Sequence, residues 1–358
     1  MKVCVYAISK NEEKFVERWY NSVKEADEVY VLDTGSKDKT VKLLRKLGVN
    51  VVRKKIKPFR FDVARNMSLE LVPADTDICV CCDLDEVFES GWRDELEKNW
   101  NEDINRVSYN YNWKLDKNNK PMVSFYLDKI HSRDNYKWTH PVHEVLTYTG
   151  KIEEKKILID TITLNHYPDN NKSRDSYLPL LELSVKEDPN DDRNMHYLGR
   201  EYMYYDMWNE AIDTLIKHLA LPTSTWNDER CASMRFISRC YGYMGRFEEA
   251  KMWVDKAILE APYLRDPYLE KAILYYQLKD WEEVKKNCLL ALNIKEHKKT
   301  YINEVFSWDT TVYELIAISD YYLSNYEEAL VYINIALDMK PGDERILGNK
   351  KFIEEKLA

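Results

Sequence analysis

The second half of the chain repeats one short pattern four times. Each copy has an aromatic residue, two further residues of which at least one is acidic, and a small apolar residue. The copies are WNEA at 208–211, FEEA at 247–250, WEEV at 281–284 and YEEA at 326–329. Small residues also follow seven positions after the last three copies, at Ala257, Ala291 and Ala336. Small side chains at fixed places let two helices approach closely, so the pattern predicts stacked helix pairs.

The spacing of the copies defines the length of the repeat. Ala250 and Val284 are 34 residues apart, and the two flanking intervals are longer, which predicts insertions in two inter-repeat loops. This half resembles the tetratricopeptide repeat, a helix pair of about 34 residues. The charge-rich segment 352–356 suits a terminal capping helix. Such arrays are typically binding surfaces or dimer interfaces, so we expect the chemistry in the first half and a homodimer through the repeats.

The first half alternates short apolar runs with helical stretches. Strands are expected at 3–8, 28–32, 49–53 and 78–82, and helices at 12–23, 38–47 and 61–71. This order is typical of a mostly parallel sheet covered by helices. At roughly 150 residues per domain, 358 residues suggest two domains. We predict an α/β domain at 1–170 and an all-α repeat domain at 171–358.

Composition and charge exclude several classes of protein. A net charge of −9 without a basic stripe argues against nucleic-acid binding. We expect no transmembrane segment, because no apolar run approaches 18 residues, and the start of the chain does not resemble a signal peptide. Seven scattered cysteines suit reduced thiols in a cytoplasmic protein. Cys79 and Cys82 have CxxC spacing, but no second ligand pair follows, so we interpret them as strand packing.

Polar residues follow three of the predicted strands. Ser9, Asn11 and Glu12 follow the first strand, Asp33 ends a second, and Asp83 and Asp85 follow the fourth. In open α/β sheets, ligands bind outside the carboxyl ends of the strands. Carboxylates one residue apart point the same way if a strand continues through them, and they suit Mg²⁺ or Mn²⁺ with a phosphate as co-ligand. The alternative for Asp83 and Asp85 is a solvated turn.

Two further residues could contact a nucleotide. Asp33 could bond a ribose or a base edge, or could be a turn residue, because Asp-Thr-Gly-Ser is good turn chemistry. Arg65 could bind a phosphate or a base, or could form a salt bridge on an exposed helix. The chain has no GxGxxG, GxxxxGK[ST] or GxSxG motif. A bound nucleotide would therefore depend on a metal and an arginine rather than on a glycine loop.

These residues together resemble the family-2 glycosyltransferases of the GT-A fold. The resemblance rests on Asn11-Glu12, the segment Asp33–Thr40, Ala64-Arg65-Asn66 and the DxD motif at Asp83 and Asp85. The fusion to tetratricopeptide-like helices is similar to a subgroup that includes the peptide S-glycosyltransferase of sublancin biosynthesis and enzymes acting on cell-surface glycans. That subgroup also has a Val-His-Glu segment, present at residues 142–144, and a later strand that ends in a histidine, at His166.

The resemblance implies a function and a set of roles. It implies metal-dependent inverting transfer of a hexose or N-acetylhexosamine from a UDP-sugar to a peptide, protein or glycan acceptor. The implied nucleotide-sugar contacts are Ser9, Asn11, Glu12, Asp33, Arg65 and Asp83. The implied ligands of Mn²⁺ or Mg²⁺ are Asp85, Asp83 and His166.

The catalytic base is left open by the sequence. The family's usual Glu-Asp base motif is absent in its common form, and Glu144 or His143 is the candidate in its place. For Glu144 the alternative is a salt bridge or a residue at the start of a helix, and for the histidines it is a structural hydrogen bond. A thiol acceptor would need less help from a base, because its pKa is near 8.5.

Two other classes of function compete with this hypothesis. One is a non-catalytic tetratricopeptide adaptor with a degenerate nucleotide-binding head, against which the intact Asp83/Asp85 pair argues. The other is a nucleotidyltransferase, which would need a basic phosphate loop near the start, where Lys10 stands alone.

Overall fold

A computed structural model describes residues 1–169, 177–298 and 300–358. The chain divides into two compact units, one comprising Met1–Ser184 and the other Val185–Lys298 with Ile302–Ala358. The predicted domain boundary between residues 170 and 171 lies outside the described residues. The first unit is α/β and the second is helical, as the sequence predicts. Within the described ranges, no helix has the length and apolar character needed to cross a membrane.

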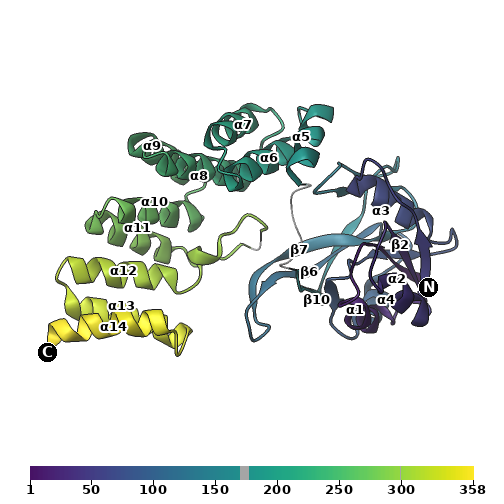
Figure 1. The fold of residues 1–358 in the computed structure, drawn as a ribbon, viewed down its shortest axis with the longest axis horizontal. Coiled ribbons are helices and arrows are strands. Elements are labelled where there is room, and N and C mark those ends of the chain that lie inside the picture. The colour runs from purple at the N-terminus through teal and green to yellow at the C-terminus, as the bar shows by residue number, and fades with distance from the viewer. Residues whose placement is uncertain (170–176, 299) are drawn as a thin grey trace. The chain divides into compact units, whose positions relative to one another are not determined.

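The first unit is built on an eight-stranded sheet with the order β3-β2-β1-β4-β7-β6-β10-β5 (Figure 1). Strands β3, β2, β1 and β4 are parallel, β7 is antiparallel to both β4 and β6, β10 runs parallel to β6, and β5 is antiparallel to β10. The strands are β1 (Val3–Ser9), β2 (Glu28–Asp33), β3 (Asn50–Arg53), β4 (Ile78–Cys81), β5 (Glu86–Phe88), β6 (Arg106–Leu115), β7 (Pro121–Ser132) and β10 (Lys156–His166). A separate hairpin pairs β8 (Tyr136–Thr139) with β9 (Val145–Tyr148).

Helices and the hairpin cover the two faces of this sheet. The helices are α1 (Val16–Val23), α2 (Thr40–Lys46), α3 (Phe61–Glu70) and α4 (Trp92–Asn99). Alternate residues of β1 enter two cores: Val3 and Val5 pack with side chains of α1, α2 and α4, while Cys4 and Tyr6 pack with α3 and the β8-β9 hairpin. Figure 1 shows α3 on one side of the sheet and α1, α2 and α4 on the other. Burial on both faces explains the continuous apolar strands.

The predicted elements differ from the observed ones mainly at their ends. Helix α1 begins at Val16 rather than at residue 12, because Asn11 has a φ of 58° and a turn precedes the helix. Strand β4 ends at Cys81, so Asp83 and Asp85 lie in a turn closed by a hydrogen bond from the Glu86 amide to the Asp83 carbonyl. The condition under which the two carboxylates would point the same way is therefore not met.

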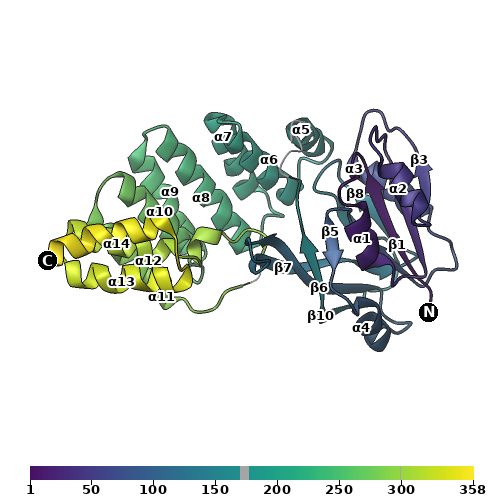
Figure 2. The ribbon, with the colours of Figure 1, turned by 60° about the horizontal axis from the view of Figure 1, so that its bottom comes forward.

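The second unit consists of antiparallel helix pairs. Helices α6 and α7, α8 and α9, α10 and α11, and α12 and α13 pack as pairs, and α14 closes the array against α12 and α13 (Figures 1 and 2). The helices are α5 (Tyr177–Glu187), α6 (Asp192–Tyr204), α7 (Trp208–Ala220), α8 (Asn227–Tyr243), α9 (Phe247–Glu260), α10 (Asp266–Gln277), α11 (Trp281–Asn293), η1 (Val305–Ser307), α12 (Thr311–Tyr322), α13 (Tyr326–Met339) and α14 (Glu344–Leu357).

The repeated sequence pattern marks the start of the second helix of each pair. The aromatic residue of each copy is the first residue of α7, α9, α11 or α13, and the small residue three positions later is fully buried. Two residues before each aromatic, the backbone takes a positive φ, at Asp206, Gly245, Lys279 and Ser324. A single left-handed residue therefore makes each tight break, and only Gly245 does so without a Cβ penalty.

The two long intervals of the repeat have different structural causes. The interval before the fourth copy contains a loop at 294–310 with the short helix η1, as predicted. The interval before the second copy does not contain a loop insertion, and that prediction is wrong. Helix α8 has 17 residues where α10 has 12, and this difference accounts for the extra length.

Candidate active site

The carboxyl ends of the parallel strands bring the first predicted residues together. Strands β1 and β2 are in register, so that Ser9 is opposite Asp33. Both residues are buried, and the Ser9 hydroxyl donates to Asp33 Oδ2 at 3.3 Å. Cys82 continues from β4 and donates its amide to the Tyr6 carbonyl, which brings the next residue, Asp83, to the same edge of the sheet.

The loops after β1 and β2 are joined by side-chain hydrogen bonds. The Asn11 amide donates to Ser36 Oγ at 2.8 Å, and the Lys37 amide donates to Asn11 Oδ1 at 2.7 Å. The amide of the buried Glu12 donates to Thr40 Oγ1 at 2.7 Å. Asn11 and Glu12 thus shape this edge of the sheet through contacts with the Asp33–Thr40 segment.

Asp33 accepts several hydrogen bonds at the bottom of this edge. The Ser36 amide donates to its Oδ1 at 3.1 Å, and Arg53 Nε donates to the same atom at 3.1 Å. The Asp33 side chain is fully buried, whereas that of Arg53 is half exposed. Sequence reasoning missed Arg53, although it ends strand β3 and the rule about strand ends applies to it.

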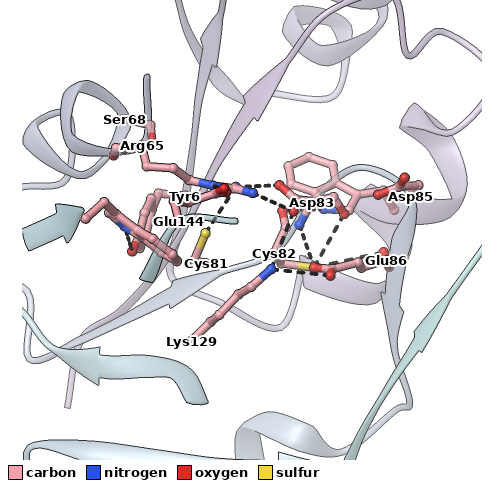
Figure 3. Close-up of polar contacts among 12 residues, drawn as sticks. Tyr6, Arg65, Ser68, Cys81, Cys82, Asp83, Asp85, Glu86, Lys129 and Glu144 are labelled. Atoms are coloured by element: carbon pink, nitrogen blue, oxygen red, sulfur yellow. Dashed lines mark hydrogen bonds and ion pairs between the residues drawn. The ribbon is translucent and has the colours of Figure 1, made fainter. Parts of the chain in front are cut away.

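Arg65 is the centre of the site and joins two other predicted residues (Figure 3). Its two terminal nitrogens donate to the two oxygens of Asp83, with Nη2 at 2.7 Å from Oδ2, and its Nε donates to Glu144 Oε1 at 2.9 Å. Helix α3 supplies Arg65, the turn after β4 supplies Asp83, and the β8-β9 connection supplies Glu144. The indole of Trp138 lies 5.4 Å from the guanidinium carbon. Arg65 is buried, so these ion pairs are shielded from water.

Lys129 is a second cation at the site, and the sequence analysis missed it. Its Nζ lies 3.5 Å from Asp83 Oδ2 and 3.5 Å from Glu86 Oε1. Burial alone would raise the pKa of Asp83, but the Arg65 and Lys129 cations hold that pKa well below its ordinary value. Burial raises the pKa of Glu86, which accepts from the Tyr111 hydroxyl at 2.9 Å and from the Asp83 amide at 2.9 Å. Asp83 is therefore an anion held by two cations.

Asp85 and His166 form a separate pair at the site. His166 Nε2 lies 3.6 Å from Asp85 Oδ2, and the Tyr167 amide donates to the Asp85 carbonyl at 2.8 Å. Burial alone would lower the pKa of His166, but the neighbouring Asp85 carboxylate outweighs it and raises that pKa above its ordinary value. His166 ends β10, and β5 pairs with β10 so that Glu86 is opposite His166.

The donor atoms at the site fit a divalent cation in part. Among the residues that the structure describes, no group of three or more His, Cys, Asp or Glu side chains could hold a metal. Asp85 and His166 nevertheless offer a carboxylate oxygen and an imidazole nitrogen 3.6 Å apart. Such a two-residue set suits Mn²⁺ or Mg²⁺ whose other positions are filled by phosphate oxygens and water. Asp83 fits this role less well, because both its oxygens bond Arg65.

The candidate bases lie in the turn between β8 and β9. Glu144 is mostly buried and accepts from Arg65, and His143 has a φ of 50° with its ring 5.7 Å from that of Tyr177. His140 also has a positive φ, of 73°. A carboxylate bonded to a guanidinium is a weak proton acceptor while the bond lasts. Glu144 therefore has a second role available, which is to hold Arg65.

The comparison with protein families matches the first unit. Residues 4–158 match the family described as Glycosyl transferase family 2. A protein of Rickettsia bellii named "Uncharacterized glycosyltransferase" is 38% identical over 97 residues, which is 27% of this chain and 32% of that protein. An uncharacterized glycosyltransferase of Rickettsia conorii is also 38% identical over 97 residues, which is 33% of its length. The chain thus matches about a third of the length of these curated relatives.

The solved structures found by comparison are helical repeat proteins. MamA is 19% identical, with a TM-score of 0.38 over 46% of this chain and 88% of its own. A thermophilic TPR protein of Thermus thermophilus is 18% identical, with a TM-score of 0.37 over 51% of this chain and 90% of its own. The family match covers the sheet, the Arg65 cluster and Asp85, so the chain carries a glycosyl transferase family 2 domain at residues 4–158, followed by a helical repeat unit.

Proposed function

We propose that the chain is a metal-dependent inverting glycosyltransferase that moves a hexose or an N-acetylhexosamine from a UDP-sugar to a peptide, protein or glycan acceptor. One observation carries the proposal. Arg65, Asp83 and Glu144 form a buried ion cluster at the carboxyl end of β4, inside the region that matches the family. Open α/β sheets bind their ligands at this edge.

The residues of the first unit divide the work on the donor. Asp33 and Arg53, at the ends of β2 and β3, are placed to contact the uridine. Arg65 supplies a fixed positive charge for the diphosphate, since Asp83 and Glu144 orient its guanidinium. Asp85 and His166 would hold the Mn²⁺ or Mg²⁺, which supplies further neutralisation of the diphosphate.

The proposed reaction is a single displacement. The acceptor oxygen or sulfur forms a bond to the anomeric carbon, and the bond between that carbon and the diphosphate oxygen breaks, with its electron pair leaving on UDP. The acceptor proton passes to a base on the face away from the diphosphate. Glu144 and His143 are the candidates for this base, and Glu144 can accept the proton only when it is released from Arg65.

The second unit is proposed to serve the acceptor or a second copy of the chain. Arrays of helix pairs present extended surfaces for binding. A cytoplasmic location also remains a proposal. The cysteines agree with it, because all seven are buried free thiols.

The experiment is a donor screen with Mn²⁺ that follows slow hydrolysis of UDP-glucose, UDP-galactose and UDP-N-acetylglucosamine. Calorimetry with UDP and GDP complements it. We expect UDP to bind more tightly than GDP, and Asp33→Ala to weaken UDP by at least roughly tenfold, or 1.4 kcal/mol. UDP binding without any turnover would instead support the adaptor hypothesis, and absence of nucleotide binding would contradict both.

A further inference from the structure

Trp113 is an unusually exposed aromatic residue beside the site. It lies near the end of β6, and 48% of its surface is exposed. Its indole is stacked on the imidazole of His166, with ring centroids 4.5 Å apart and planes at 14°. A tryptophan so exposed contributes little to a core, so this stack calls for another explanation.

Trp113 also holds His166 through its backbone. His166 Nδ1 lies 3.1 Å from the Trp113 carbonyl oxygen, which can only accept. Nδ1 is therefore the protonated nitrogen, and in the neutral ring Nε2 keeps its lone pair. That Nε2 is the atom that faces Asp85, at 3.6 Å. The ring is thus fixed in its plane by the stack and in its tautomer by the carbonyl.

We propose that Trp113 is a positioning residue that holds the His166 imidazole so that Nε2 can bind a divalent cation together with Asp85. This inference rests on the proposed function, because it requires the cation that the donor diphosphate would share. Groups that orient a metal-binding histidine commonly change metal affinity by 10- to 100-fold. Nothing in the sequence pattern singles out Trp113, because its effect depends on the pairing of β6 with β10.

The test measures Mn²⁺ binding itself. Mn²⁺ is titrated into the full chain at saturating UDP, and a titration of Mn²⁺ into UDP without protein is subtracted. Trp113→Ala removes the stack but leaves the main-chain carbonyl, so we expect a roughly tenfold loss of Mn²⁺ affinity. Trp113→Phe keeps an aromatic face and should stay within roughly threefold of the wild type. Trp226→Ala, which removes a 39% exposed tryptophan from the second unit, should change nothing.

A double-mutant cycle separates positioning from general damage. If Trp113 acts through His166, then Trp113→Ala should have almost no further effect in a His166→Ala background. Equal losses in both backgrounds would overturn the inference, as would a loss in His166→Ala with none in Trp113→Ala. The proposed metal site would survive either of those results. If the wild type binds no Mn²⁺ with UDP, the metal site and this inference both fail. Thermal unfolding of each variant checks that the fold is retained.

Discussion

Arg65 donates from Nε to Glu144 Oε1 across 2.9 Å, although 79 positions separate the two residues in the chain. The same guanidinium holds both oxygens of Asp83. All five donors of an arginine are directional, so the two carboxylates fix the plane of the group as well as its charge. The site thus has its main cation oriented before any substrate arrives.

Removal of this cation should destabilise the first unit. Arg65→Met leaves Asp83 and Glu144 facing each other in a largely buried place with only Lys129 nearby, and we expect a loss of about 3 kcal/mol in the free energy of unfolding. Urea unfolding measures it. Lys98→Met removes a cation from an exposed pair with Glu95 and is the control that should not change stability. Equal stability of both variants would contradict the buried-cluster interpretation.

Part of this site could be predicted because it depends on strand ends alone. Ser9, Asp33 and Asp83 each follow a strand of the parallel half of the sheet, and parallel strands bring their carboxyl ends to one edge. Lys129 depends instead on the pairing of β7 with β4, in which Val80 is opposite Ile130. No local pattern fixes a pairing between strands that are fifty residues apart, so Lys129 could not be found from the sequence.

The helical unit gives the same lesson at one position. The repeat predicts small residues seven positions after each copy, and Ala257, Ala291 and Ala336 are fully buried. In the first copy that position is His218, also fully buried. His218 bonds Ser233 Oγ on α8 at 2.9 Å, and Ser233 also bonds His196 Nδ1 at 2.8 Å. A partner on another helix replaces the close approach, and the repeat pattern contains no sign of it.

Two glycines in this unit should respond in opposite ways to alanine. A Cβ on Gly199 in α6 would lie 2.5 Å from Leu215 Cγ on α7, so Gly199→Ala should cost roughly 1–3 kcal/mol. Gly348 in α14 has no atom within 4 Å of that position, and Gly348→Ala should stabilise by up to about 1 kcal/mol through helix propensity. Chemical unfolding compares them, and a stabilising Gly199→Ala would show that the two helices are not in close contact.

Asp85 should affect turnover rather than stability. Its side chain is partly exposed and pairs only loosely with His166, at 3.6 Å. Asp85→Ala should lower UDP-sugar turnover by roughly 10²-fold or more, because the diphosphate loses the cation that Asp85 holds. Circular dichroism and the thermal midpoint should stay close to those of the wild type. Turnover that resists both this substitution and EDTA would rule out the metal.

His131 should make the first unit less stable in acid. Its ring is fully buried, with Nε2 2.9 Å from the Tyr6 hydroxyl and Nδ1 2.7 Å from the Ser132 carbonyl. Burial lowers the pKa of His131 from 6.5 to about 3. The folded chain therefore keeps this ring neutral, and the unfolded chain takes up the proton first as the pH falls below 6.5. The stability that the neutral ring contributes is present above pH 6.5 and is lost toward pH 3.

The magnitude follows from the same linkage. Between pH 6.5 and pH 4, His131 alone should remove roughly 3 kcal/mol of unfolding free energy. His131→Gln keeps an acceptor for Tyr6 and has no proton to gain, so its urea midpoint should fall less steeply over this range. Parallel pH curves for the two proteins would show that the ring is protonated in the folded state.

Glu144 has two candidate roles, and two substitutions distinguish them. As a base it must take up a proton, and an amide cannot, so Glu144→Gln and Glu144→Ala should both lower transfer by roughly 10²- to 10⁴-fold with UDP affinity unchanged. As the partner of Arg65 it needs only an oxygen that accepts from Nε, which Gln also offers and Ala does not. Glu144→Gln should then retain most of the activity, while Glu144→Ala loses both transfer and UDP affinity. Measurement of kcat and of the Kd for UDP in both variants decides, and we expect the second pattern, because the Arg65 bond is already made without substrate. The base would then be His143, or the acceptor would be a thiolate that needs none.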